Sequence, residues 1–373
     1  MTSKDLKPGV AGQVAKSFIH SKLTPVIIGT SLLLGLFAVL ITPKEEEPQI
    51  SVPMIDIQIG VPGFEAKEVE RKVVEPIERA VWGLDGVEYV YSSSRPSGAL
   101  ITVRFKVGDP IEPSLLKVHH KLMVVRSEMP KEALDPVVKS YSIDDVPFLT
   151  LTFSSSEMDD FELRRIIAPL ARELSSTPDL SRVELLGGLK RAVRVIADPA
   201  KLQSRGISML TLADALRKND SVMPGQKTWG ENQIYDVEIG GRLRSGEDVK
   251  RISLGQRAGT VVRVSDVAQV IDGPEERVRG SLLVSKENGI QTERAVSIVF
   301  AKRKGTNVVE LAKRILKHTA TFSKDLPESV HFSVTRDYGS TAEAKSNELI
   351  EHLLIATLSV SVLIALFMGI RAA

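Results

Sequence analysis

The amino-acid sequence predicts a membrane protein in which two spanning α-helices enclose an α+β body. Two apolar blocks without a charged residue lie near the two ends of the chain, at residues 23–42 and 353–370. Between them, short strand-like alternations take turns with apolar stripes of helical period, the pattern of an α+β domain. Together these observations predict the fold class.

The composition excludes several classes of protein. The 49 Lys and Arg residues nearly balance 47 Asp and Glu, and the net charge of +2 lacks the basic excess of a nucleic-acid-binding protein. The absence of cysteine excludes thiol catalysis, thiolate metal sites and disulfides. No phosphate-binding glycine loop, HExxH or GxSxG motif occurs, so we expect neither an enzyme nor a cofactor or metal site.

Each apolar block is long enough to cross a bilayer. At ~1.5 Å per residue, a helix over 23–42 spans a hydrocarbon core of ~30 Å. Pro25 falls in its first turn, where a missing N–H costs little. A signal peptide is the alternative, but the block is longer than the ~7–15 residues of a signal-peptide core and no small-residue cleavage site follows. The block at 353–370 predicts the second span.

The second span is expected to extend beyond the membrane. Ser340 and Glu343 have the spacing of a capping box, which starts a helix near Thr341. A continuous helix over 341–370 is ~45 Å long, more than a bilayer needs. We therefore expect a rod that joins the membrane to the soluble body.

The flanking charges predict the orientation of the chain. Lysines precede the first block and glutamates follow it, which favours a cytoplasmic amino terminus. Arg371 follows the second block, so both termini are expected in the cytoplasm and the body outside it, in the periplasm of a two-membrane bacterium. Residues 1–22 carry Val10, Val14 and Phe18 at helical spacing, which predicts either a helix in the membrane interface or a cytoplasmic extension of the span.

The body begins with a predicted β-α-β-β-α unit. Period-two alternation indicates its strands, and apolar residues at four-residue spacing indicate its helices. The expected elements are a strand at 50–59, a helix at 65–82, strands at 87–91 and 99–105 joined by the serine-rich turn 92–98, and a helix after Asp109-Pro110.

The same order returns downstream, which indicates an internal duplication. The expected elements are a strand at 148–153, a helix at 161–174, a strand at 183–186, and, after an interruption, a strand at 295–301, a helix at 308–320 and a strand at 330–335. They complete a second split β-α-β sandwich of the ferredoxin-like kind. The interruption, at 234–271, is rich in short β-like runs and predicts a small inserted subdomain.

Two spans that enclose tandem β-α-β units, the second with an insert, resemble the amino-terminal portion of a resistance-nodulation-division (RND) efflux permease of the hydrophobe/amphiphile, or multidrug, exporter type. The order and spacing of several short motifs carry the resemblance. They are Val61-Pro62-Gly63, Pro76-Ile77-Glu78, the run 83–87 with the serines 92–94, the strand 101–105, the run 183–187, and Asp337-Tyr338 before the second span.

The resemblance implies a domain organisation and a set of partners. It implies a first porter subdomain at 44–135, a second at 136–182 with 273–335, and a docking subdomain at 183–272. It also implies a homotrimer in the inner membrane lipid, working with a periplasmic adaptor protein and an outer-membrane channel. An arm at 219–235 would reach the neighbouring protomer, although a plain surface loop is the equal alternative.

By the same resemblance, substrate would meet the second porter subdomain. Phe148 matches a pocket phenylalanine of the family, and Glu184 and Leu186 fall on the neighbouring pocket strand. The position of Leu186 is aromatic in well-known drug pumps, so this pocket is expected to suit flat aromatic drugs less well. A core role for Phe148 is the equal alternative, because buried phenylalanine is common.

The family's proton antiport uses buried charges in later membrane helices, and neither apolar block here contains one. We therefore expect this portion to be inactive alone. The alternatives are a two-span periplasmic ligand sensor and an accessory protein of the secretion machinery. A two-span sensor requires an output domain after its second span, and only residues 371–373 follow that block here, which counts against the sensor.

Overall fold

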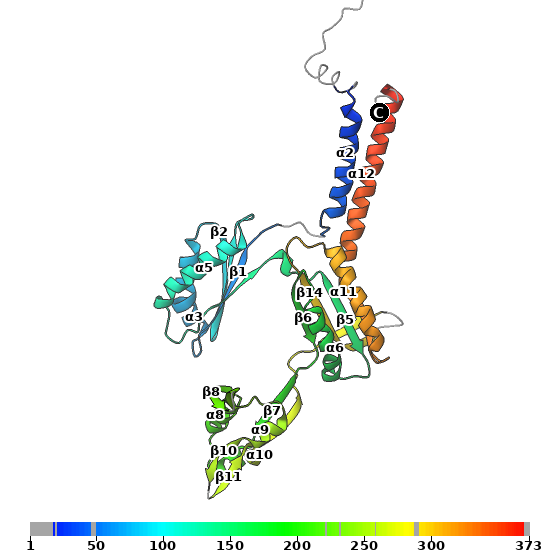
Figure 1. Cartoon of the computed structure of the whole chain (residues 1–373). Coiled ribbons are helices and arrows are strands. Elements are labelled where there is room, and N and C mark those ends of the chain that lie inside the picture. Colours follow the sequence, from blue (N-terminus) through cyan, green and yellow to red (C-terminus); the bar gives the residue numbers. More distant parts are fainter. Residues whose placement is uncertain are drawn as a thin grey trace, which may run out of the picture.

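A computed structural model describes residues 18, 21–45, 50–220, 222–230, 233–257, 259–286 and 291–368 (Figure 1). Most of the helix expected at 1–22, and the end of the one expected at 341–370, lie outside these residues. The described part has mixed α/β content, and all of its paired strands are antiparallel. It contains three separate hydrophobic cores, so the body consists of three units.

The first unit has the element order β-α-β-β-α-β and a sheet in the order β2-β3-β1-β4. Its elements are β1 (Met54–Gly60), α3 (Ala66–Val69), a π-helical turn (Glu70–Val74), α4 (Glu75–Trp82), β2 (Val87–Arg95), β3 (Gly98–Phe105), α5 (Ile111–Val125) and β4 (Val137–Tyr141). The π-helical turn precedes Pro76, which has no N–H to continue a regular helix.

Two expectations for this unit were wrong. The serines 92–94 lie inside β2 and not in a turn, because the hairpin turns at Pro96 and Ser97, whose φ of 64° supplies the left-handed turn. The boundary after residue 135 was also misplaced. β4 pairs with β1, with Ile57 opposite Val138, so the first unit extends to Tyr141.

The second unit repeats the same order, with strands β6-β14-β5-β15 in its sheet. Its elements are β5 (Leu149–Ser155), α6 (Asp160–Leu174), β6 (Leu180–Gly187), β13 (Leu282–Ser285), β14 (Gln291–Lys302), α11 (Val308–Phe322) and β15 (His331–Asp337). The boundary expected at residue 183 cuts β6, which pairs with β14 along its whole length. It was wrong because the chain leaves the second unit only after β6, at Gly187 and Gly188, which both have positive φ.

The insert enters the second unit between β6 and β13 and has its own core. Its elements are β7 (Arg191–Ala197), α7 (Pro199–Ser204), α8 (Met209–Asn219), β8 (Val222–Gly230), β9 (Gln233–Gly240), α9 (Gly246–Arg251), β10 (Ser253–Arg257), β11 (Thr260–Arg263), α10 (Val264–Val267) and β12 (Ala268–Pro274). β7 and β12 pair and form its entry and exit strands. Strands β8 and β9 form a separate hairpin where the arm was expected.

Two apolar helices, α2 (Leu23–Ile41) and α12 (Tyr338–Met368), extend from the same end of the second unit (Figure 1). Their large apolar side chains are exposed, as in Leu32 and Leu363. In the described part of the chain, the stretch Tyr338–Phe367 is the one helix long and apolar enough to cross a membrane, and Leu23–Val39 is a shorter apolar helix.

Helix α12 begins at Tyr338, three residues before the expected start, directly after β15. Its first turns belong to the core of the second unit, because Ala342 is 1% exposed there. Lys313 of α11 donates a hydrogen bond of 2.6 Å to Glu343. The apolar rod is therefore continuous with the packed core of this unit.

Candidate functional site

The face of the second unit's sheet that lies opposite α6 and α11, called the open face, carries two of the three predicted site residues. Along β6, Val183 and Leu185 pack on the core beneath the helices, so the alternate residues Glu184 and Leu186 point the other way. Leu186 is 47% exposed, which is unusual for a leucine in a sheet. Glu184 lies 3.5 Å from Arg182 in an exposed ion pair, a contact worth little to stability.

Phe148 is not on this face. It is 2% exposed and belongs to the core of the second unit. Its backbone N–H donates to Phe300, and its carbonyl accepts from Tyr338 at the start of α12. In this structure Phe148 therefore packs against the apolar core, and it is not brought together with Glu184 and Leu186.

The open face becomes polar beyond β6. Thr152 of β5 is 4% exposed, and its hydroxyl lies 2.8 Å from that of Ser297 and 2.9 Å from that of Thr335. The three hydroxyls join β14, β5 and β15 side by side. The face thus presents an apolar edge at Leu186 and a hydrogen-bonded hydroxyl row behind it, a surface suited to an amphiphilic ligand.

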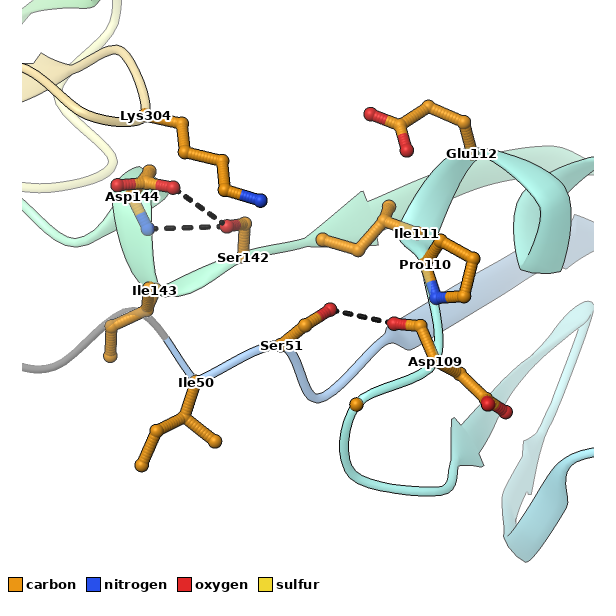
Figure 2. A pocket seen from close by; sticks show the side chains of 11 residues that line it. Ile50, Ser51, Asp109, Pro110, Ile111, Glu112, Ser142, Ile143, Asp144 and Lys304 are labelled. Atoms are coloured by element: carbon orange, nitrogen blue, oxygen red, sulfur yellow. Dashed lines mark hydrogen bonds between the residues drawn. The ribbon is translucent and has the colours of Figure 1, made fainter.

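A cavity of about 390 Å³ lies where the first unit, the linker between the units and a loop of the second unit meet (Figure 2). It is lined by Ile50, Ser51, Gly108, Asp109, Pro110, Ile111, Glu112, Ser142, Ile143, Asp144 and Lys304. The Ser51 hydroxyl donates 2.7 Å to the carbonyl oxygen of Asp109. Ser142 caps the turn that holds Asp144, since the Asp144 N–H donates to its hydroxyl.

Beside this cavity, three charged residues from distant parts of the chain meet. The ammonium of Lys302, at the end of β14, lies 3.1 Å from a carboxylate oxygen of Glu45 and 2.8 Å from one of Asp144. All three side chains are only 12–14% exposed. Glu45 follows α2 and Asp144 lies between the two units, so this cluster ties the segment after α2 to the body.

No motif in the sequence predicted this cluster. The acidic run at 45–47 was used only to predict orientation, and Lys302 carries no motif. The order of the strands brings these three residues together, and the spacing of nearby residues in the sequence does not predict this contact. The available signal was a glutamate three residues after the end of an apolar block.

A family profile described as AcrB/AcrD/AcrF matches residues 14–373. The chain belongs to this family. The resemblance to the amino-terminal portion of an RND permease is thereby confirmed, as is the expectation that the chain belongs to a family of transporters and not of enzymes. Among the described residues, no group of three or more His, Cys, Asp or Glu side chains could hold a metal ion.

Several family members are similar along nearly the whole chain. Multidrug resistance protein MdtC of Proteus mirabilis is 25% identical over 342 residues, which cover 91% of this chain and 33% of that protein. Protein HelA of Legionella pneumophila is 27% identical over 354 residues, covering 91% and 32%. MdtC of Yersinia enterocolitica is 22% identical, covering 94% and 34%. The chain thus spans about a third of the length of these relatives.

A charged clamp, formed by Arg191, Asp272 and the N–H of Gly246, lies at the base of the insert. Asp272 of β12 accepts two hydrogen bonds from the Arg191 guanidinium, at 2.8 and 2.7 Å, and one of 2.8 Å from the N–H of Gly246. The Arg191 hydrogen bonds, and then that of Gly246, hold the pKa of Asp272 below its usual range. The clamp thus joins the entry strand β7 and the exit strand β12 to α9.

The clamp predicts an acid-sensitive insert. Because the pKa of Asp272 is lowered in the folded state, its contribution is complete above its unfolded pKa of about 3.9 and is lost as the pH falls through the lower folded pKa. Hydrogen exchange of the Gly246 amide, followed from about pH 5 down to about pH 2, measures this loss. Asp272→Asn should remove the contribution of Asp272 to the acid step and raise the exchange rate at the upper end of this range.

A smaller acid step should remain in Asp272→Asn. The N–H of Arg244 and the hydroxyl of Ser245 lower the pKa of Asp248 in the same way. Glu276→Gln, an exposed carboxylate on the same segment, is the matched control and should keep the wild-type profile. An unchanged profile in Asp272→Asn would contradict the assigned role of the clamp.

Proposed function

We propose that this chain is the amino-terminal part of a proton-driven RND efflux permease of the multidrug type, which exports small molecules from the inner membrane and periplasm. The observation that carries the proposal is the family match across residues 14–373. MdtC, similar over 91% of the chain, is by name a multidrug resistance protein. The described apolar helices carry no acidic or basic side chain within 23–41 or 353–368, so this portion would not move protons alone.

The architecture supports specific assignments. We assign the first and second units as ferredoxin-like porter subdomains, because both have the order β-α-β-β-α-β and the same strand arrangement. The insert is assigned as the docking subdomain, at the end of the body away from the apolar helices (Figure 1). Helices α2 and α12 would be the two spans, with both termini in the cytoplasm and the body in the periplasm.

The partners proposed for the complete protein follow from these assignments. The protein would be a homotrimer in the inner membrane lipid, and the β8–β9 hairpin would be the arm that reaches the neighbouring protomer. The insert would face an adaptor protein and an outer-membrane channel. Substrate would contact the open face at Glu184 and Leu186, whereas Phe148 would act from the core behind it.

Single-cysteine labelling tests the topology, since the natural chain contains no cysteine. In spheroplasts, a membrane-impermeant maleimide is expected to label Ser93→Cys in the first unit and Thr260→Cys in the insert, both exposed positions. Ser3→Cys should be labelled only after lysis. Labelling of Ser3→Cys but not Ser93→Cys in intact spheroplasts would reverse the topology and refute the proposal.

The same method tests the substrate face. Tetraphenylphosphonium, a bulky and non-planar apolar cation, should slow the labelling of Leu186→Cys, because Glu184 attracts its charge and the exposed edge accepts its rings. Thr260→Cys serves as the control and should be unaffected. Adding Glu184→Gln should weaken the protection, and equal labelling of Leu186→Cys with and without the cation would refute a substrate role for this face.

A further inference from the structure

A second, smaller cavity lies between α6 and the segment that enters the insert. Its volume is about 240 Å³. It is lined by Phe161, Arg164, Arg165, Ala168, Arg172, Leu189, Lys190 and Arg191. Five of these eight residues are positively charged and none is negatively charged, although the chain as a whole is nearly neutral.

Two of the five cations already have partners within the protein. The Arg164 guanidinium donates to the carbonyl oxygens of Leu185 and Gly187, and burial lowers its pKa. Arg191 is held by Asp272 in the clamp at the base of the insert. These two arginines hold the walls of the cavity and are not available to a ligand.

The other three cations have no such partner in the part of the chain that the structure describes. The side chains of Arg165, Arg172 and Lys190 are exposed and make no ion pair or hydrogen bond among those residues. Like charges held around one small space repel one another, and the carboxylate of Glu275, which accepts 3.0 Å from the Lys190 N–H, offsets only part of this repulsion. A bound anion would remove that repulsion and would accept charge-assisted hydrogen bonds.

The apolar part of the lining restricts the kind of anion. Phe161, Arg165, Ala168 and Arg172 recur at helical spacing, so apolar and cationic side chains alternate along one stripe of α6. Leu189 faces this stripe because its N–H donates 3.1 Å to the carbonyl oxygen of Asp160. The cavity is smaller than the ~300–1,000 Å³ of ordinary ligand pockets, which favours a small ligand.

We propose that this cavity binds a small organic anion, with Arg165, Arg172 and Lys190 holding its acidic group and Phe161 and Leu189 contacting its apolar part. The ligand would be soluble and not a membrane lipid, because α6 lies on the far side of the second unit from the apolar stretch of α12 (Figure 1). A bound anion would bridge α6 and the segment that enters the insert, and it would therefore join the second unit to the insert.

Isothermal titration of the full chain in non-ionic detergent, with phenyl phosphate at low ionic strength, tests this site. We expect saturable binding that weakens with added salt, since the three cations are exposed. The double variant Arg165→Gln, Arg172→Gln should weaken binding about tenfold or more. Hydrogen exchange of the Leu189 and Lys190 amides should slow on binding in the wild type.

The matched control removes the same amount of charge from the insert, away from the cavity. Arg205 and Arg242 are exposed and lie outside the cavity lining, so Arg205→Gln, Arg242→Gln should bind as the wild type does. Equal weakening in both double variants would refute the site, and so would an absence of saturable binding. Equal affinity for inorganic phosphate would refute an organic ligand. Binding to phosphatidylglycerol vesicles but not to phenyl phosphate would refute a soluble one.

Discussion

Replacing Lys302 with methionine is expected to lower the free energy of unfolding of the second unit by about 3 kcal/mol, because it leaves two enclosed carboxylates without their shared cation. The Lys302 ammonium lies 3.1 Å from Glu45 and 2.8 Å from Asp144, and its side chain is 12% exposed. Denaturant unfolding followed by hydrogen exchange measures the loss. The amide of Val308, which donates 3.2 Å to the carbonyl oxygen of Lys44, should exchange faster.

The neighbouring Lys304 provides the control. It lines the same junction (Figure 2) but is exposed, so Lys304→Met should change stability by less than about 0.5 kcal/mol. Lys302→Arg keeps the positive charge and should recover part of the loss. If Lys302→Met and Lys304→Met had equal effects, the enclosed cluster would not contribute to the junction.

Replacing Gly188 with alanine is the second change with a large expected effect. Gly188 has a φ of +65°, and an added Cβ would lie 2.6 Å from Cβ of Arg164 and 2.7 Å from the carbonyl oxygen of Asp160. Backbone strain and steric overlap together should cost about 3 kcal/mol, because a backbone carbonyl cannot move aside as a flexible side chain can. Denaturant unfolding with exchange of the β6 and β14 amides measures this cost.

Gly241 is the matched control, because its Cβ would meet no atom within 4 Å. Gly241→Ala should be close to neutral. The Gly188 result also bears on the anion cavity, since Gly188 lets the chain pass close to α6 just before Leu189 and Lys190. A tolerated Gly188→Ala would indicate that this close approach is not rigid.

Much of the local structure followed from the pattern of residues. The strand predicted at 148–153 is β5 (Leu149–Ser155), and the helix predicted at 161–174 is α6 (Asp160–Leu174). These predictions are confirmed because apolar residues line one face of each element and therefore recur with its period. Apart from the serines 92–94, which lie inside β2, the errors are at unit boundaries, where the partner of a strand cannot be predicted from its own residues.

β4 and β6 illustrate this limit. No strand was predicted at 137–141, and its pairing with β1 places β4 in the first sheet. Leu186 and Gly187 end a strand that the residue pattern placed in the second unit and the resemblance placed in the docking subdomain. Pairing with β14 places it in the second unit. Strand pairing depends on contacts between residues that are far apart in sequence, and alternation encodes only which side chains face inward.

The candidate site shows the same division. The resemblance selected Glu184 and Leu186, and the alternation along β6 puts both on one face, but the sequence left Phe148 undecided between pocket and core. The structure places Phe148 in the core because its backbone is held between Phe300 and Tyr338. Neither of these partners is near it in sequence.

By itself, the sequence determined that the chain has two apolar helices around an α+β body and that it resembles the RND permeases, since these features depend on local composition, period and motif order. Tertiary structure alone decided the unit boundaries, the Glu45, Asp144 and Lys302 cluster, and the cationic cavity beside α6. The physical reason is that charges act through space. Lys302 meets partners that are 257 and 158 residues away along the chain, and no periodic pattern extends over such separations.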